Sequence, residues 1–404
     1  MTENTAKTAD LRVVVVCAIA DIGKSAWDSC LAATAGPHPS NPFVTFDFLQ
    51  ALEASACIGA PTGWLPQHLW LQNGSGRTLG VMPAYLKSHS MGEYVFDQGW
   101  AQAFESAGGD YYPKVQCSVP FTPVTGPRIL IAPGVDRGFA IQAMAGAIKE
   151  LTARLGASSA HVAFVEEGQM AGLRAVGFLP RTDRQFHWHN AGYTDFDAFL
   201  AQLNARKRKA IRKERARSLA GGIKIELLTG AQIKPHHWDV FYRFYLDTGE
   251  RKWGEPYLNR QFFESLGAAM SAHVLLVMAK QNDTYIAGAL NLIGADTLFG
   301  RYWGCLETHE FLHFEVCYYQ AMDYAIAHGL KTVEAGAQGE HKLARGYMPV
   351  TTYSAHHIRH PGLARAIADY LEEERQHVEL ERAILSGHGP FRKSPSNWKK
   401  QSTT

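Results

Sequence analysis

The strongest constraint on the fold of this 404-residue chain is an order of predicted elements that occurs twice. In each half, two short β-rich runs are joined by a polar turn, as in a β-hairpin, and a third β-rich run follows. A segment of helix-forming composition that ends at a glycine comes next, and another apolar strand follows it. The stretches are 68–71, 78–82, 94–96, 139–155 and 161–165 in the first half, and 274–278, 285–290, 297–299, 312–327 and 331–335 in the second.

This repeat predicts an α/β protein with two related domains, each a mixed sheet with helices packed against it. We expect an N-terminal domain at 10–195, a basic connecting helix at 196–222, a C-terminal domain at 223–390 and a flexible tail at 391–404. A chain of this length is typical of two domains.

Composition excludes several classes of protein. A formal net charge of +2 excludes binding of nucleic acid through overall charge, and 46% hydrophobic residues suffice for packed cores. The apolar run at 13–20 is too short to span a bilayer, and the leader before it lacks the basic region of a signal peptide. Six cysteines without a CxxC pair are typical of a reduced, cytoplasmic protein. We therefore expect no membrane insertion.

The positive charge is concentrated between the two halves. Residues 204–217 read NARKRKAIRKERAR, with eight Lys or Arg against one Glu. This composition favours a helix, which Gly221 and Gly222 would end. The helix could simply be a solvated connector, or it could bind the phosphates of a donor substrate through Lys207, Arg208 and Arg212.

Ionisable residues crowd into the loop after the last strand of the repeat. Residues 336–349 read GAQGEHKLARGYMP. Transfer of an acyl group to an amine needs a proton acceptor and hydrogen-bond donors for the developing oxyanion. Glu340, His341 and Lys342 are therefore candidate catalytic residues, and Arg345 is a candidate for binding a donor phosphate. The alternative is a tight loop whose charges pair with one another.

Several segments resemble the GNAT-fold, FemAB-like predicted N-acyltransferases, also described as peptidoglycan-biosynthesis-like proteins. They are NPF at 41–43, GWLP at 63–66, GEYVFD at 92–97, YYPK at 111–114, PFTPVTGPR at 120–128, QFHW at 185–188 and the loop GAQGEHKLARGY. The resemblance implies a tandem GNAT-like fold and transfer of an acyl or aminoacyl group to an amine. It also implies an essential basic residue near the stretch from Lys342 to Gly346.

The donor stays open within this resemblance. Acetyl-CoA-dependent members of the fold carry an Arg/Gln-x-x-Gly-x-Gly/Ala loop for the CoA pyrophosphate, which 129–138 and 304–311 lack. FemAB-like enzymes also lack it and use aminoacyl-tRNA. We therefore expect acyl-CoA or aminoacyl-tRNA as donor substrate, a small-molecule or peptide amine as acceptor, and no permanently bound cofactor.

Four residues are candidates for contact with the acceptor: Tyr302, Trp303, His187 and Asp97. Each is a polar or aromatic residue within or beside an apolar run, so a role in the core is the alternative.

Two other functions compete with acyl transfer. His309-Glu310-Phe311-Leu312-His313 fits the zinc signature H-E-x-x-H of metallohydrolases, which needs both histidines on one helical face. A helix that begins near Leu312 would not provide that face, and we expect no metal. The other competitor is a non-catalytic binding protein with degenerate transferase domains.

Overall fold

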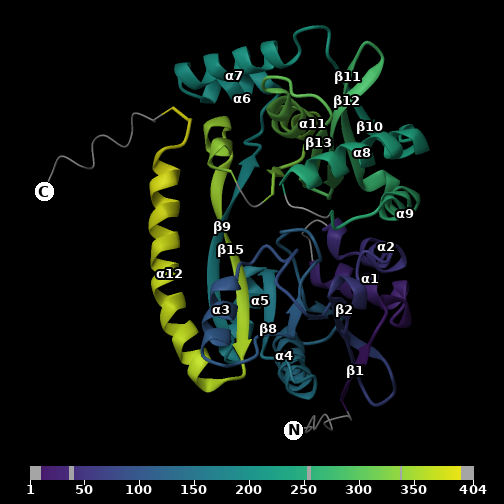
Figure 1. Ribbon diagram of the computed structural model, residues 1–404, viewed down its shortest axis with the longest axis vertical. Coiled ribbons are helices and arrows are strands. Elements are labelled where there is room, and N and C mark those ends of the chain that lie inside the picture. The colour runs from purple at the N-terminus through teal and green to yellow at the C-terminus, as the bar shows by residue number, and fades with distance from the viewer. Residues whose placement is uncertain (1–10, 36–40, 253–255, 337–338, 393–404) are drawn as a thin grey trace, which may run out of the picture. The chain divides into compact units, whose positions relative to one another are not determined.

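The computed structural model describes residues 11–35, 41–252, 256–336 and 339–392. The chain forms two compact units (Figure 1). Unit 1 consists of Met1–Asp183, Glu255–His273 and Thr351–Glu379, and unit 2 of Arg184–Gly254, Val274–Val350 and Leu380–Thr404. Each unit is therefore assembled from separate stretches of sequence, whereas the predicted domains are continuous.

Unit 1 contains two sets of paired strands. One is an antiparallel sheet in the order β1-β3-β4-β7, and the other follows the order β15-β8-β6-β5-β2, in which β6 and β8 are parallel. The bounds are β1 (Arg12–Val16), β2 (Trp64–Pro66), β3 (His68–Gln72), β4 (Thr78–Met82), β5 (Tyr85–Lys87), β6 (Lys114–Cys117), β7 (Leu130–Ile131), β8 (Ser159–Val165) and β15 (Met348–Ile358), the last of which begins in unit 2.

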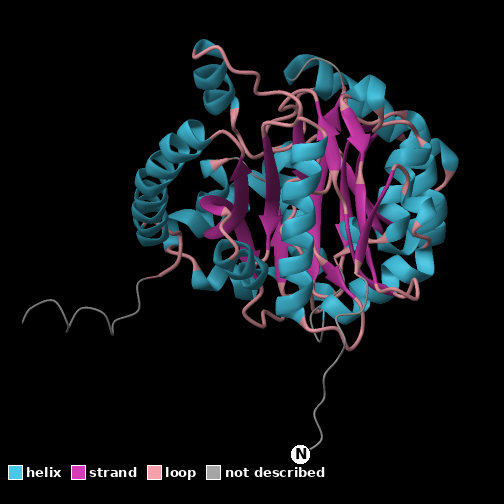
Figure 2. Ribbon diagram, turned by 90° about the horizontal axis from the view of Figure 1, so that it is seen from below, coloured by secondary structure: helices cyan, strands magenta, loops and turns pink. Residues whose placement is uncertain are grey.

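Helices of unit 1 bury an apolar core on these strands. Met144 and Ile148 of α4 belong to one cluster with Val115 of β6 and Val162 of β8. Figure 2 shows helices flanking the strands. The helix bounds are α1 (Lys24–Ala35), α2 (Phe46–Ala54), α3 (Gln98–Ser106), α4 (Arg137–Arg154), α5 (Glu167–Ala175), α9 (Arg260–Met270) and α12 (Pro361–Gly387), the last of which ends in unit 2.

Unit 2 has the strand order β10-β11-β12-β13-β14-β9, in which only the β13–β14 pair of these described strands is parallel. The strands are β10 (Lys224–Thr229), β11 (Val274–Gln281), β12 (Thr284–Ile293), β13 (Thr297–Cys305), β14 (Thr332–Glu334) and β9 (Leu179–His189), the last of which begins in unit 1. The helices are α6 (Phe196–Gln202), α7 (Ala205–Ser218), α8 (Pro235–Lys252), α10 (Leu312–Phe314), the π-helix η6 (Glu315–Tyr319), α11 (Gln320–Ala327) and the 3-10 helix η7 (Glu340–Arg345).

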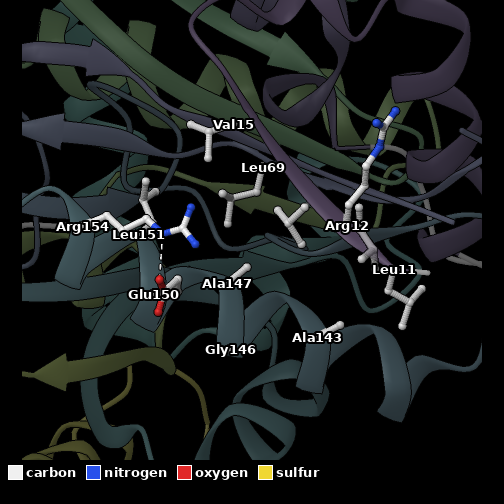
Figure 3. Close-up of a pocket in the computed structure, with 12 residues that line it drawn as sticks. Leu11, Arg12, Val15, Leu69, Ala143, Gly146, Ala147, Glu150, Leu151 and Arg154 are labelled. Carbon is white, nitrogen blue, oxygen red and sulfur yellow. Dashed lines mark hydrogen bonds and ion pairs between the residues drawn. The ribbon is translucent and has the colours of Figure 1, made fainter. Parts of the chain in front are cut away.

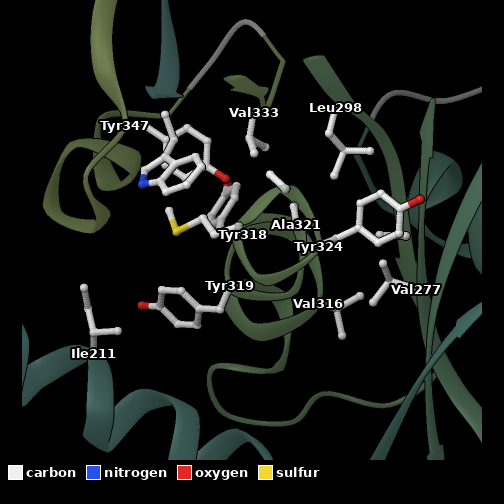
Figure 4. Close-up of a cluster of buried hydrophobic side chains, with 14 of the residues drawn as sticks. Ile211, Val277, Leu298, Val316, Tyr318, Tyr319, Ala321, Tyr324, Val333 and Tyr347 are labelled. Carbon is white, nitrogen blue, oxygen red and sulfur yellow. The ribbon is translucent and has the colours of Figure 1, made fainter. Parts of the chain in front are cut away.

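The chain between β13 and β14 covers the sheet of unit 2. Val316 of η6 and Ala321 of α11 share one buried cluster with Leu298 and Val333 of the sheet (Figure 4). A π-turn inserts an extra residue into a helix, and such turns are frequent at functional sites. Two successive residues of this π-turn, Tyr318 and Tyr319, are both buried.

The structure confirms the mixed α/β class and the repeated order of antiparallel strands, helix and parallel strand. One predicted element is wrong: residues 94–96 form a bend and no strand. Tyr94 has a φ of +59°, which extended backbone excludes, and the carboxylates of Glu93 and Asp97 on either side bind the Lys114 amine of β6. β5 and β6 provide the strands instead.

The ends of the predicted elements agree with local signals. Asn204 caps the basic helix α7, because its Oδ1 accepts a hydrogen bond from the Lys207 N–H at 3.0 Å. At the predicted tail, Phe391 pairs with Leu203, while residues 393–404 lie outside the described part of the chain. None of the helices in the described ranges combines the length and apolarity that crossing a membrane requires.

Candidate active site

The predicted glycine-bounded loop forms a compact turn directly after β14. The chain leaves β14 through Gly336 (φ +74°) and enters η7 between Gly339 (φ +120°) and Gly346 (φ +92°). A Cβ on Gly346 would lie 2.8 Å from the ring of Phe199, so this glycine also allows close packing. Residues 337–338 lie outside the described chain.

Lys342 points back toward the end of β14. Its side chain is buried, and its Nζ donates hydrogen bonds to the carbonyl oxygens of Ala335 at 2.5 Å and Gly336 at 3.0 Å. An ammonium has three N–H groups, so the third has no acceptor among the residues that the structure describes. Burial, followed by the charge of Arg301, lowers the pKa of Lys342 to about 8. The amine can therefore change its protonation state near neutral pH.

Arg345 holds η7 against the basic helix. Its guanidinium donates to Glu214 Oε2 of α7 at 2.9 Å and to the His341 carbonyl at 2.8 Å, and it lies 3.4 Å from the ring centroid of Phe314. The Tyr319 hydroxyl lies 3.1 Å from Nε. This geometry favours a structural role for Arg345 over the predicted contact with a donor phosphate.

His341 lies at the surface beside a group of aromatic rings. Its Nε2 is 2.9 Å from the Tyr318 hydroxyl, and its ring centroid lies 5.7 Å from that of Phe314 and 6.3 Å from that of His313. The His313 ring in turn lies 5.2 Å from Trp303. We call Trp303, His313, Phe314 and His341 the ring patch. Glu340, the third predicted catalytic residue, has its backbone in η7, and its side chain is outside the described part.

A buried ion pair that the sequence did not predict adjoins Lys342. Arg301 Nη2 lies 2.6 Å from Glu334 Oε1, and these side chains are 2% and 3% exposed. Arg301 is the extra residue of a β-bulge, since Gly300 and Tyr302 on either side of it pair with the adjacent residues Asn291 and Leu290 of β12. Bulges re-aim side chains and are common next to active sites.

His187 completes this group on the neighbouring strand. It is in register with Glu334, and its Nε2 lies 3.9 Å from Glu334 Oε2. Burial lowers the pKa of His187 to about 4, against the opposing effect of Glu334, so the imidazole is neutral at pH 7. The predicted acceptor residue His187 is thus brought near the predicted catalytic residue Lys342. A signal for Glu334 was present in the sequence as a lone carboxylate at the end of an apolar strand.

The other predicted acceptor residues contact other side chains. The Tyr302 ring packs edge-on against Tyr245 of α8 at 5.3 Å. Asp97 belongs to unit 1, where its carboxylate accepts hydrogen bonds from Lys114 and from the Tyr111 hydroxyl. Trp303 is part of the ring patch. Of the four candidates, His187 and Trp303 therefore lie among the groups around η7.

The basic helix α7 has a packed face and a free face. Ile211 is buried, and Arg215 pairs with Glu315 at 2.8 Å. Arg212, a predicted donor-binding residue, pairs with Asp197 at 2.7 Å. Lys207 and Arg208 are half-buried. Three basic side chains are exposed and have no ion pair or hydrogen bond among the described residues, namely Arg206, Lys209 and Lys213.

The zinc signature does not have the geometry of a metal site. α10 begins at Leu312, so His309 precedes the helix, where it lies 3.2 Å from Glu307. Glu310 pairs with Arg217. Across the described ranges, no group of three or more His, Cys, Asp or Glu side chains is arranged to hold a metal ion.

A pocket of about 340 Å³ in unit 1 is a poor candidate for the site. It lies between β1, β3 and α4, and its lining is mostly aliphatic, with the exposed Glu150–Arg154 pair at 2.7 Å (Figure 3). None of the predicted site residues lines it.

Comparison with known proteins agrees with the fold. A family model for FemAB-like proteins, described as peptidoglycan biosynthesis/recognition, matches residues 18–393. No curated protein matches the sequence closely enough to indicate a relationship.

Solved structures match over most of the chain. The crystal structure of FemX is 14% identical with a TM-score of 0.51, over 85% of this chain and 98% of that one. A conserved protein of unknown function from Bacteroides thetaiotaomicron is 12% identical with a TM-score of 0.51, over 86% of this chain and 100% of that one. A tandem GNAT protein from the clavulanic acid biosynthesis pathway is 14% identical with a TM-score of 0.44, over 87% and 99% of the two chains. The family match and the likeness to FemX confirm the predicted tandem GNAT-like fold.

Proposed function

Because this chain belongs to the FemAB-like family of peptidoglycan biosynthesis/recognition proteins, we propose that unit 2 transfers an acyl or aminoacyl group from a phosphate-bearing donor to an amine. The family and the fold together support a transferase, and the proposal adds the site and the residues. The observation that carries it is Lys342, a buried amine that two backbone carbonyls hold in place and whose third N–H has no acceptor within the described part of the chain.

The proposed reaction forms a C–N bond and breaks a C–O or C–S bond. The acceptor amine attacks the carbonyl carbon of the donor ester or thioester, and the donor oxygen or sulfur leaves. The nitrogen loses one proton and the leaving group gains one. Lys342 donates its free N–H to the developing negative charge, gives its proton to the leaving group and is then reprotonated from water. The nitrogen of the tetrahedral intermediate gives its extra proton to His341, which returns it to water. A pKa near the working pH suits an acid with this task.

The neighbours of Lys342 suit it to act as this acid. His187 is half-buried and neutral, so it adds no competing charge. The Tyr318–His341 contact holds η7 on the helix that precedes β14. His341 itself is exposed, and its imidazole is a predicted group that can take up the proton from the attacking amine.

The surroundings of η7 support a donor that carries an adenine and phosphates, as acyl-CoA and the 3′ end of aminoacyl-tRNA both do. Bases stack on aromatic rings, and the half-buried Trp303, Phe314 and His313 of the ring patch offer such surfaces. The free basic side chains of α7 offer charge for phosphates. The acceptor that fits the family description is an amine of a peptidoglycan precursor or of another peptide or small molecule.

The direct test is transfer measured with purified protein. Radiolabelled acetyl-CoA and radiolabelled aminoacyl-tRNA are each incubated with a peptidoglycan-precursor peptide that carries a free amine. We expect transfer from one donor, and a loss of about 100-fold or more in kcat for Lys342→Met with an unchanged Kd for the donor. Donor binding by calorimetry without any transfer would instead indicate a non-catalytic binding protein.

A further inference from the structure

The Arg301–Glu334 pair lies where it can act on Lys342. Glu334 is the last residue of β14, and the two carbonyls that hold the Lys342 amine belong to the next two residues, Ala335 and Gly336. The same strand end therefore carries the ion pair and the lysine contact. Both members of the pair are almost fully buried, so solvent screens their charges little.

The bulge on β13 explains how Arg301 reaches this place. In a regular ladder, residues 300 to 302 of β13 would face three consecutive residues of β12. The bulge makes Arg301 the extra residue in the register with β12, and its side chain crosses to β14 to meet Glu334. Arg301 also donates from Nη1 to its neighbouring carbonyl, that of Gly300, at 2.8 Å, which fixes the guanidinium. A buried arginine on a bulge is a costly arrangement that a merely structural strand does not need.

We propose that the Arg301–Glu334 pair is a positioning device that sets the acid strength of the Lys342 amine, with Arg301 favouring release of the proton and Glu334 opposing it. This inference rests on the proposed function for its catalytic meaning. Arg301 has a larger effect on the pKa of Lys342 than Glu334 has, which agrees with burial and Arg301 together lowering it. The other groups near the amine are the thiol of Cys317 on η6 and the neutral imidazole of His187 on β9.

The proposal predicts that changing one member of the pair raises the pKa of Lys342 and that changing the other lowers it. A purely structural role predicts no such opposite shifts. Arg301→Gln removes the positive charge that favours release of the Lys342 proton, so the pKa of Lys342 rises toward its ordinary value. Glu334→Gln keeps the volume and an acceptor for Arg301 but removes the negative charge, so the pKa of Lys342 falls further. Loss of packing would change stability in both variants and would not move the pKa in opposite directions.

A test that needs no donor uses the coupling of proton binding to unfolding. Lys342 has a lowered pKa in the folded protein, so the unfolded chain binds more protons between about pH 8 and 10.5, and stability rises with pH in that window. The equilibrium constant for unfolding is measured for the wild type and for Lys342→Met at each pH. The ratio of the wild-type constant to the variant constant is expected to fall by up to about tenfold per pH unit in this window. The same comparison is made in the Arg301→Gln and Glu334→Gln backgrounds by urea unfolding.

The lower limit of this pH window is the pKa of Lys342 in the folded protein. We expect this limit to move to higher pH in Arg301→Gln, to move to lower pH in Glu334→Gln, and to be unchanged in Arg301→Lys. Movement in the same direction, or no movement, overturns the inference. If Arg301→Gln does not fold, the Glu334→Gln comparison alone decides, because the absence of a downward shift contradicts the proposal. In an assay of transfer, the pH above which the rate declines should shift in the same direction as the pKa of Lys342 in each variant. Opposite shifts in the donor-free titration together with no transfer by the wild type would leave this inference intact and reject the proposed function.

Discussion

Two histidines lie in the core of unit 1, on facing positions of β8 and β15. Their Nδ1 atoms are 2.7 Å apart, and each Nε2 lies near a serine hydroxyl, that of Ser159 at 2.8 Å or Ser354 at 3.0 Å. A hydrogen bond between two ring nitrogens needs one donor and one acceptor, so His161 and His356 cannot both be protonated without breaking it. Burial, followed by Lys114, lowers the pKa of His161 to about 3, and burial and His161 lower that of His356 well below its ordinary value.

This pair predicts a loss of stability in mild acid. The unfolded histidines bind protons below about pH 6.5 while the folded ones stay neutral, so the stability that they contribute is present above pH 6.5 and is lost progressively below it. We expect a loss of about 1 kcal/mol per histidine between pH 7 and 5.5, measured by urea unfolding. His356→Asn should reduce this pH dependence, and His377→Gln, on an exposed position of α12, should leave it unchanged. An undiminished pH dependence in His356→Asn would contradict the interpretation.

At the scale of elements, η7 depends on the glycine that ends it. Gly346→Ala adds strain at a φ of +92° and drives a Cβ to 2.8 Å from the Phe199 ring, whereas Gly329→Ala adds similar strain at +67° with no heavy atom within 4 Å. We expect Gly346→Ala to destabilise the protein by about 1–3 kcal/mol more than Gly329→Ala, measured by chemical denaturation. Transfer should fall with it because η7 carries Lys342. Equal effects of the two changes would show that the ring contact contributes nothing.

Helix α7 predicts a salt-dependent contact with the donor. Arg206, Lys209 and Lys213 are exposed and have no ion pair with any side chain in the described ranges, so changing all three to Gln should weaken binding of aminoacyl-tRNA most at low salt. If each charge contacts one phosphate, the slope of log K against log salt falls by about 2 in magnitude, measured by filter binding at several salt concentrations. The same number of changes on unit 1, at Arg12, Arg77 and Arg154, serves as the control. An unchanged slope of log K against log salt would show that α7 only connects the flanking segments and does not contact donor phosphates.

The elements also show what the sequence could and could not predict. The repeat, the basic helix and the turn around Lys342 follow from composition, glycine placement and periodicity, which act locally. The Arg301–Glu334 pair does not, because it depends on a bulge whose position is set by pairing with β12, far away in the sequence. The bend at 94–96 was missed for a similar reason, since Lys114 of β6 binds the carboxylates on both sides of it. Arg345 shows the converse: its position in a loop suggested a ligand, and tertiary contacts with Glu214 and Phe314 occupy it.

At the scale of the whole molecule, the continuous domains expected at 10–195 and 223–390 differ from the units that form, because the chain returns to unit 1 twice. The last return supplies residues that complete its core. Ala355 of β15 belongs to the same cluster as Val162 of β8, and Ile367 and Leu371 of α12 pack with Trp100 and Tyr111. Local sequence patterns do not show which unit a segment packs against, because the residues of β15 and α12 would favour a strand and a helix in either unit.

This arrangement predicts that residues 1–195 do not fold alone. The fragment lacks β15, so β8 keeps an unpaired edge and His161 loses its partner His356, and it lacks the α12 side chains that cover Trp100. The loss of each large apolar side chain from the core lowers the free energy of unfolding by about 2–5 kcal/mol. Together these losses exceed the stability of a typical domain. We expect the fragment to show collapsed ¹H–¹⁵N NMR dispersion, and co-expression with residues 196–404 to restore it. A well-dispersed spectrum of the fragment alone would show that 1–195 is an autonomous domain, as the sequence pattern suggests, and that the later segments only decorate it.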